Sequence, residues 1–146
     1  RDFPGGWAVD QHTAFCSNED NKCRAYQTGR TPEEEAYFQF TKSLLNWRKD
    51  QKVIHEGKLL QYVPQNNVYV YFRYLEPIKE MGQPAEVIMV VINNSTKEQT
   101  LSWSRFTEGF KGYDKGKDVL TNQTFDFEVP NGSIPAKTSY IIKLSH

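Results

Sequence analysis

Carboxylates are the first side chains in this sequence whose type is suited to catalysis. One form of acid–base cleavage uses two carboxyl groups that face each other across the bond, one as proton donor and one as base or nucleophile. The aspartates we considered are Asp2, Asp10, Asp20, Asp114, Asp118 and Asp126. They fall in turn sequences or at expected exposed strand positions, and their spacing identifies no pair. We therefore expect solvated or capping carboxylates here.

Histidines and cysteines give no metal-binding pattern. His12, His55 and His146 lie far apart in the sequence, and the two cysteines lie together in one loop. A structural zinc site needs four such ligands at characteristic spacings. The sequence therefore predicts no metal site, and it implies no cofactor.

The two cysteines, Cys16 and Cys23, close the segment CSNEDNKC. In an oxidising compartment they could form a disulfide that restrains the loop, and in a reducing cytosol they would be free thiols. Spacing alone does not decide between these states. The oxygen-bearing side chains between them lack the regular spacing of a calcium loop, so a solvated turn is the simpler interpretation.

Length and charge limit the classes of protein to consider. The chain has 146 residues, with 18 basic and 18 acidic side chains. This length suits one globular domain, and the balanced charge gives no electrostatic reason to expect nucleic acid as a partner. The longest apolar run, residues 87–92, is far short of the roughly 20 residues that a membrane-spanning helix needs. Because the chain starts at Arg1 in loop-type sequence, we expect a piece of a longer protein.

Residues 1–30 carry no apolar periodicity, whereas the next segment has the strongest helix signal in the chain. The first stretch is too long for an ordinary connection, so we expect a long ordered loop that packs on another surface. Thr31, Pro32 and Glu34 then form a capping-box pattern, which predicts a helix over residues 31–50. Its apolar side chains spread over about 200°, twice the stripe of an ordinary surface helix. Two surfaces should therefore cover it, and the chain alone is expected to form a homodimer.

From residue 57 onwards the hydrophobic period changes to two. Short segments rich in β-branched and aromatic residues alternate with turn sequences, which is typical of an antiparallel β-sandwich of about seven strands. In residues 68–73, valines and Phe72 alternate with Tyr69, Tyr71 and Arg73, so one aromatic row should be half buried. The fold class is therefore mainly β, a sandwich preceded by a long loop and one helix. The predicted strand segments are KLLQYV, NVYVYFRYL, AEVIMVVIN, EQTLSW, KDVLT, TFDFEV and SYIIKLS.

Several motifs together resemble one enzyme family. They are DFPGGW and TAF near the start, SLLNWRK at the end of the predicted helix, and then VIHEGKLLQY and VYVYFRY. In this combination the chain resembles the end of the neopullulanase and cyclomaltodextrinase branch of the α-amylase family, especially the starch-utilisation enzymes of Gram-negative bacteria. The resemblance implies a periplasmic or cell-envelope location, where Cys16 and Cys23 would be bridged.

The resemblance also implies a domain arrangement. Residues 1–52 would be the last loop and helix of a truncated TIM-like catalytic barrel, and residues 53–146 the C-terminal β-sandwich. The catalytic carboxylates of the family would lie outside this chain. Arg1, Asp2 and Trp7 would line the substrate rim, because loops after barrel strands form the active-site face. The alternative is that Phe3 and Trp7 anchor the loop on the barrel.

The function implied by the resemblance is the C-terminal part of an α-glucan hydrolase that acts on starch, pullulan or maltooligosaccharides, and that is inactive by itself. Two alternatives come from other classes of protein. A non-catalytic carbohydrate-binding module would use exposed aromatic side chains, and an interaction sandwich would bind no ligand. The aromatic candidates for the binding module are Trp103, Tyr113, Tyr69 and Tyr71.

Overall fold

The computed structural model describes residues 30–78, 82 and 85–146. The chain divides into two units, one ending at Trp47 and one spanning Arg48–His146, and each is described by itself. The predicted residues Arg1, Asp2, Trp7, Cys16 and Cys23 lie outside the described residues. The division falls after Trp47, and the assignment of residues 1–52 and 53–146 to two domains stays a prediction.

The helix α1 (Pro32–Lys49) confirms the predicted capping box. The backbone N–H of Thr31 donates to Glu34 Oε2 at 2.9 Å, and the N–H of Glu34 donates to Thr31 Oγ1 at 3.3 Å. These two bonds satisfy amide groups that the first helical turn leaves without partners. No residue of α1 is buried, and Tyr37 is 74% exposed.

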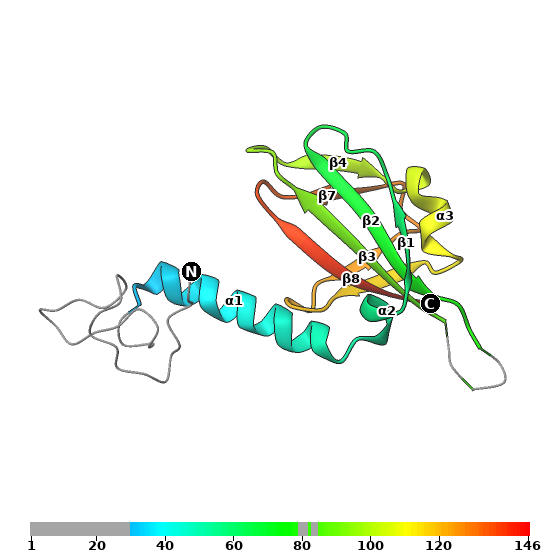
Figure 1. The fold of residues 1–146 in the computed structure, drawn as a ribbon. Helices are drawn as coiled ribbons and strands as arrows, with labels where there is room; N and C mark the ends of the chain where they lie inside the picture. The colour runs from blue at the N-terminus through cyan, green and yellow to red at the C-terminus, as the bar shows by residue number, and fades with distance from the viewer. Residues whose placement is uncertain (1–29, 79–81, 83–84) are drawn as a thin grey trace, which may run out of the picture. The chain divides into compact units, whose positions relative to one another are not determined.

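The second unit is built from two antiparallel sheets, with the large sheet in the order β1-β2-β3-β8-β5-β6 and the small sheet formed by β4 and β7 (Figure 1). The eight strands are β1 (Lys58–Gln61), β2 (Val68–Leu75), β3 (Glu86–Asn93), β4 (Gln99–Ser102), β5 (Lys115–Asp118), β6 (Thr124–Asp126), β7 (Asn131–Ile134) and β8 (Ser139–Ser145). Short helices complete the unit: α2 (Lys52–His55), η3 (Trp103–Phe106) and α3 (Thr107–Phe110). The predicted β-sandwich is therefore confirmed.

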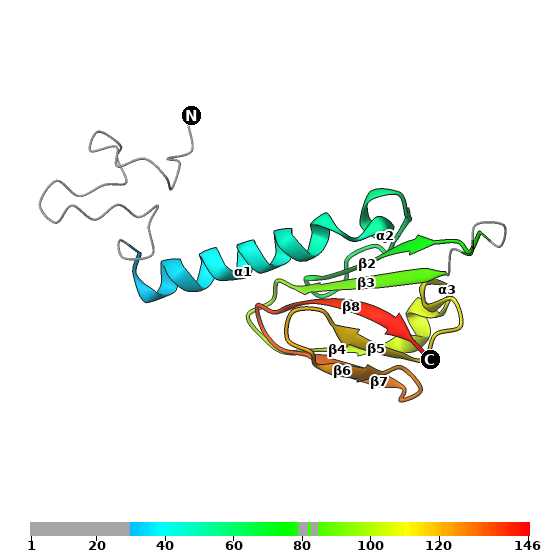
Figure 2. The ribbon, with the colours of Figure 1, turned by 90° about the horizontal axis from the view of Figure 1, so that it is seen from below.

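The core lies between the two sheets and is closed by η3 and α3. In Figure 2 the small sheet lies below β2, β3 and β8. Along β2, Val68, Val70 and Phe72 point into this core, and Leu101 of β4 and Ile134 of β7 meet them from the small sheet. Tyr69, Tyr71 and Arg73 alternate with them and are half buried, as the period of two predicts.

The outer face of the large sheet is also partly covered. Ile88 and Val90 of β3 are buried on the side opposite to the core, and Val53 of α2 is fully buried. The α2 helix packs against β2 and β3, and the Arg73 guanidinium donates to the carbonyl of Ile54 at 2.7 Å. This explains why nearly all of β3 is apolar, since both of its faces are covered.

The strand β7 is the main error of the sequence prediction, which places no strand between the segments TFDFEV and SYIIKLS. The Pro-Asn-Gly-Ser sequence at residues 130–133 has turn chemistry and is expected to be one of the turns. In the structure Gly132 pairs with Leu101 of β4. A Cβ atom at position 132 would overlap the indole ring of Trp103, so only glycine lets that ring lie against the strand. The contact with Trp103 and the pairing with β4 thus outweigh the turn preference of residues 130–133.

Several strand boundaries also differ from the prediction, and β1 and β6 end two and three residues earlier than the predicted segments. A strand over residues 98–103 is expected, but β4 ends at Ser102 and Trp103 begins η3. A strand over residues 117–121 is expected, but β5 spans Lys115–Asp118 and so includes residues that have turn chemistry. Position 116 must be glycine, because a Cβ atom there would overlap the side chain of Ile142 in the neighbouring strand β8. The short helix α2 is not expected, because a four-residue helix carries no periodic signal.

Candidate functional site

The aspartates that the structure describes do not assemble into a catalytic pair. Asp118 is predicted to be exposed, but only 2% of it is exposed. Its Oδ1 accepts the N–H of Ile141 at 2.7 Å, and its Oδ2 accepts the N–H of Thr121 at 2.8 Å. Asp118 is therefore a capping residue, as expected, but a buried one, because it ties the β5–β6 turn to β8. Asp126 accepts the N–H of Glu128 at 2.9 Å, which is an ordinary local turn bond.

Metal ligation finds no support in the described part of the chain. No group of three or more histidine, cysteine, aspartate or glutamate side chains comes together among these residues. The ring of His55 contacts the carbonyl of Arg48, and the ring of His146 packs on Tyr113. Each of these two histidines thus has a structural contact of its own.

Trp103 cannot be a surface for ligand binding, contrary to the carbohydrate-binding alternative. It is 3% exposed, and its ring makes edge contacts with Phe110 and Phe127 at 6.4 and 5.1 Å between centroids. The segment around it forms a helical turn, and this turn places the indole inside the core between the two sheets. The sequence pattern alternates up to residue 103, so it does not indicate that the strand ends at Ser102 and that a helical turn begins at Trp103.

Tyr69 and Tyr71 form a half-buried row on the outer face of the large sheet. Their ring centroids are 5.5 Å apart, and the Tyr69 hydroxyl donates to Gln61 Oε1 at 2.8 Å. Burial raises the pKa of Tyr71, and the neighbouring Tyr69 adds to this effect. Cross-strand pairing places Ile92 beside Tyr69 on the same face, where Ile92 is 38% exposed. This surface is apolar and follows the sheet.

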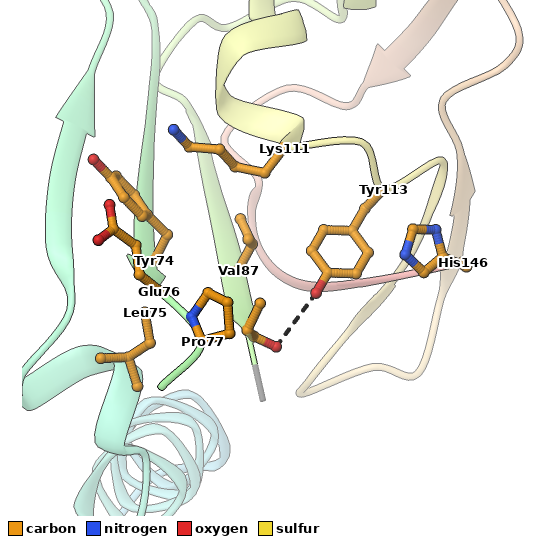
Figure 3. Close-up of a pocket in the computed structure, with 9 residues that line it drawn as sticks. Tyr74, Leu75, Glu76, Pro77, Val87, Lys111, Tyr113 and His146 are labelled. Carbon is orange, nitrogen blue, oxygen red and sulfur yellow. Dashed lines mark hydrogen bonds between the residues drawn. The ribbon is translucent and has the colours of Figure 1, made fainter. Parts of the chain in front are cut away.

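A pocket of about 360 Å³ lies where β2 ends and β3 begins. We call it the end pocket. Figure 3 shows Tyr74 and Tyr113 on opposite sides of Val87, with Lys111 above them. The residues that line it are Tyr74, Leu75, Glu76, Pro77, Ala85, Val87, Lys111, Tyr113 and His146. It therefore combines aromatic walls, an apolar floor and a few charged groups, which is the usual composition of a small-molecule site.

The aromatic walls of the end pocket are held in place by specific contacts. The Tyr113 hydroxyl donates to the carbonyl of Ala85 at 3.3 Å, and its ring lies 4.6 Å from that of His146 (Figure 3). On the other side the Lys111 amine lies 4.5 Å from the centre of the Tyr74 ring, a cation–π contact. Lys111 follows α3 with a left-handed backbone, at φ 55°.

Opposite charges lie together at the end pocket. The Lys58 amine donates to Glu76 Oε1 at 2.9 Å, and this bond lowers the pKa of the Glu76 carboxyl. The positive charge of Lys111 acts on Glu76 in the same direction. The pocket thus offers both hydrogen-bond donors and an acceptor, with no strong excess of either charge.

The sequence model of the cyclo-malto-dextrinase C-terminal domain family matches residues 59–143 of this chain. The chain belongs to this family. The match begins in β1 and ends in β8, so it spans both sheets of the second unit. Apart from His146, the residues that line the end pocket lie within the matched range.

Solved structures of larger proteins share the fold of this cyclomaltodextrinase C-terminal domain. One is the α-amylase from Geobacillus thermoleovorans, solved with acarbose, which is similar with a TM-score of 0.60 and 14% identity, over 84% of this chain and 25% of that one. Another is AmyP E221Q in complex with maltotriose, with a TM-score of 0.61 and 11% identity, over 84% of this chain and 23% of that one. The chain thus spans about a quarter of the length of these amylases.

These findings confirm the recognised family and the sandwich fold of a glycosidase C-terminal domain. Among the described residues, no helix is long and apolar enough to cross a membrane. Of the aromatic residues named from the sequence, Tyr113 lines the end pocket, Trp103 lies in the core, and Tyr69 and Tyr71 lie on the sheet face. Sequence reasoning missed Tyr74, Lys111 and Glu76, because the pocket joins the ends of elements that are distant in sequence.

Proposed function

We propose that this chain is the C-terminal part of an α-glucan hydrolase of the neopullulanase branch, acting on starch, pullulan or maltooligosaccharides. The observation that carries the proposal is the match of residues 59–143 to the cyclomaltodextrinase C-terminal domain family. The two structurally similar amylases were solved with acarbose and with maltotriose, which agrees with a glucan substrate.

In this proposal the catalytic carboxylates lie outside the chain. Both oxygens of Asp118, the aspartate that is buried as a whole residue in the described part, are already engaged by backbone N–H groups of the fold. Asp114 is half buried, and its Oδ1 has no hydrogen-bond partner among the described residues. Residues 1–52 would be the last loop and helix of the catalytic barrel, and residues 53–146 the sandwich that follows it. Arg1, Asp2 and Trp7 would then contribute to the substrate rim.

The proposed location is the periplasm or cell envelope of a Gram-negative bacterium. It rests on the resemblance to starch-utilisation enzymes, and it has a consequence for the loop. Cys16 and Cys23 would be bridged there, and the small ring would stabilise the loop by about 2 kcal/mol. Alkylation of the protein isolated without reductant should then label neither cysteine.

A substrate panel tests the proposed activity. The native protein that contains this chain should release reducing sugar from starch, pullulan and maltoheptaose, and release none from cellohexaose. The β-linked oligosaccharide is the control because it has the same sugar unit with the other anomeric configuration. Hydrolysis of the β-linked substrate alone, or of neither kind, would refute the proposed substrate class.

A further inference from the structure

The end pocket has the chemistry of a sugar-binding site. We propose that it binds a glucosyl unit of an α-glucan, against the tyrosine rings that line it. Nothing in the family match or in the fold assigns a ligand to this pocket. The identity of the sugar rests on the proposed function, whereas the class of ligand, a neutral polyhydroxylated ring, follows from the pocket itself.

Two aromatic rings of the end pocket are held in fixed positions. A pyranose ring has an apolar face of C–H groups, and the faces of tyrosine rings offer matching apolar surface with little loss of side-chain entropy. Tyr113 is anchored at its hydroxyl by Ala85 and packs against the His146 ring, and the Lys111 amine lies over one face of the Tyr74 ring, so the ring surface left for a sugar is the part that these contacts do not cover. Both walls are therefore in place before a ligand arrives.

The end pocket is lined by side chains of both charges. An anionic ligand would meet the carboxylate of Glu76, and a cationic ligand would meet the amine of Lys111, so neither class gains a clear advantage. A sugar hydroxyl both donates and accepts hydrogen bonds, and it can use an ammonium donor and a carboxylate acceptor together. The Lys58 amine holds the Glu76 carboxylate in position through its 2.9 Å bond.

The volume of the end pocket limits the size of its ligand. The volume of about 360 Å³ lies at the lower end of the range for small-molecule pockets. It suits one sugar ring rather than a long segment of glucan. The tyrosine row on the sheet face also has two neighbouring rings, tilted by 35° to each other, whereas the end pocket has Glu76 and Lys111 in its lining beside the aromatic rings.

The test is affinity electrophoresis of the 146-residue chain through a gel that contains soluble starch, supported by NMR titration with maltoheptaose. The unmodified chain should be retarded, and Tyr113→Ala should weaken binding about tenfold. Lys111→Gln should weaken it about threefold, because one hydrogen-bond donor changes its charge. Near-ultraviolet circular dichroism shows whether each variant keeps the native fold.

Two matched controls separate the pocket from general surface effects. Val63→Ala truncates an apolar side chain that is 78% exposed and lies outside both α1 and the end pocket, and Lys97→Gln removes an exposed lysine from the β3–β4 connection. Both should leave retardation unchanged. If Tyr113→Ala does not fold, Tyr113→Leu combined with Lys111→Gln decides the question, because leucine keeps apolar volume but removes the flat ring. A weakening of about tenfold is expected for that pair.

Absence of retardation of the folded chain would overturn the inference, and so would equal retardation of the pocket variants and the unmodified chain. Equal NMR shifts with cellohexaose would contradict the α-glucan assignment. This test is independent of hydrolysis. If the native protein hydrolyses starch but the end pocket binds no glucan, only this inference is refuted. If the end pocket binds glucan but the native protein does not hydrolyse starch, only the proposed activity is refuted.

Discussion

At the residue scale, two buried polar side chains hold loops of the second unit together. Asn93 and Asp118 are the buried polar residues in the described part of the chain. The Asn93 amide nitrogen lies 2.8–3.0 Å from the carbonyl oxygens of Lys97, Ile134 and Pro135. A buried polar group stabilises a fold only when its hydrogen bonds are satisfied. Here Ile134, Pro135 and Ile141 are partners from segments distant in sequence.

Replacement of Asp118 should destabilise the domain strongly. Asp118→Ala leaves the N–H groups of Thr121 and Ile141 without their acceptor, and we expect the free energy of unfolding to fall by about 2–4 kcal/mol. Urea denaturation at neutral pH measures this. Asp126→Ala is the control, because Asp126 is exposed and accepts one turn N–H, from Glu128. Equal losses for the two variants would contradict the capping role of Asp118.

The Glu76–Lys58 pair should make a pH-dependent contribution to stability. The hydrogen bond from Lys58 lowers the pKa of Glu76 in the folded chain below its ordinary value. The contribution is therefore complete above the ordinary glutamate pKa and is lost as the pH falls through the lowered folded value. An NMR titration of the Glu76 carboxyl should show the lowered midpoint, and Lys58→Met should raise it. An unchanged midpoint in this variant would show that Lys58 is not the cause.

At the element scale, the sequence predicted the helices and strands that are determined by residues close together in the chain. The capping box of Thr31 and Glu34 predicted α1, and the period of two predicted the inward row of β2, because both signals lie in neighbouring residues. The strand β7 could not be predicted in this way. Its Asn-Gly-Ser sequence favours a turn, and the strand forms through pairing with β4 and contact with Trp103.

Gly132 should tolerate no side chain if the contact with Trp103 determines β7. The added methyl group of Gly132→Ala would overlap the indole, and we expect a loss of about 1–3 kcal/mol in the free energy of unfolding. Thermal and urea denaturation measure the loss. The exposed neighbour in the same strand provides the control, Ser133→Ala, which should change stability little. A neutral effect of Gly132→Ala would show that β7 is not held by this packing.

At the scale of the whole molecule, the candidate site was harder to predict than the fold. The end pocket draws on the end of β2, the start of β3, the residues after α3 and the last residue of the chain. No sequence spacing links Tyr74, Lys111 and Tyr113, so only the sheet topology brings them together. The resemblance to the α-amylase family, in contrast, depends on contiguous motifs, and the family match confirms it.

The exposed aromatic residues of α1 should drive self-association of the chain. Tyr37, Phe38, Phe40 and Leu45 are 40–74% exposed, and burial of two large apolar side chains contributes about 3–6 kcal/mol. Light scattering at micromolar concentration should therefore give about twice the chain mass of 17.0 kDa. A double variant, Tyr37→Ser with Phe40→Ser, should shift the chain toward the monomer. A clean monomer for the unmodified chain would contradict this prediction.

The central claim is that this chain is the non-catalytic C-terminal part of an α-glucan hydrolase. The most direct measurement compares reducing-sugar release from starch by the native protein that contains the chain and by the 146-residue chain alone, at equal molar concentration. The account predicts hydrolysis by the native protein and none by the chain. Turnover by the chain alone that is lost in Asp114→Asn or Asp126→Asn would contradict it, and so would a native protein that leaves starch, pullulan and maltoheptaose intact.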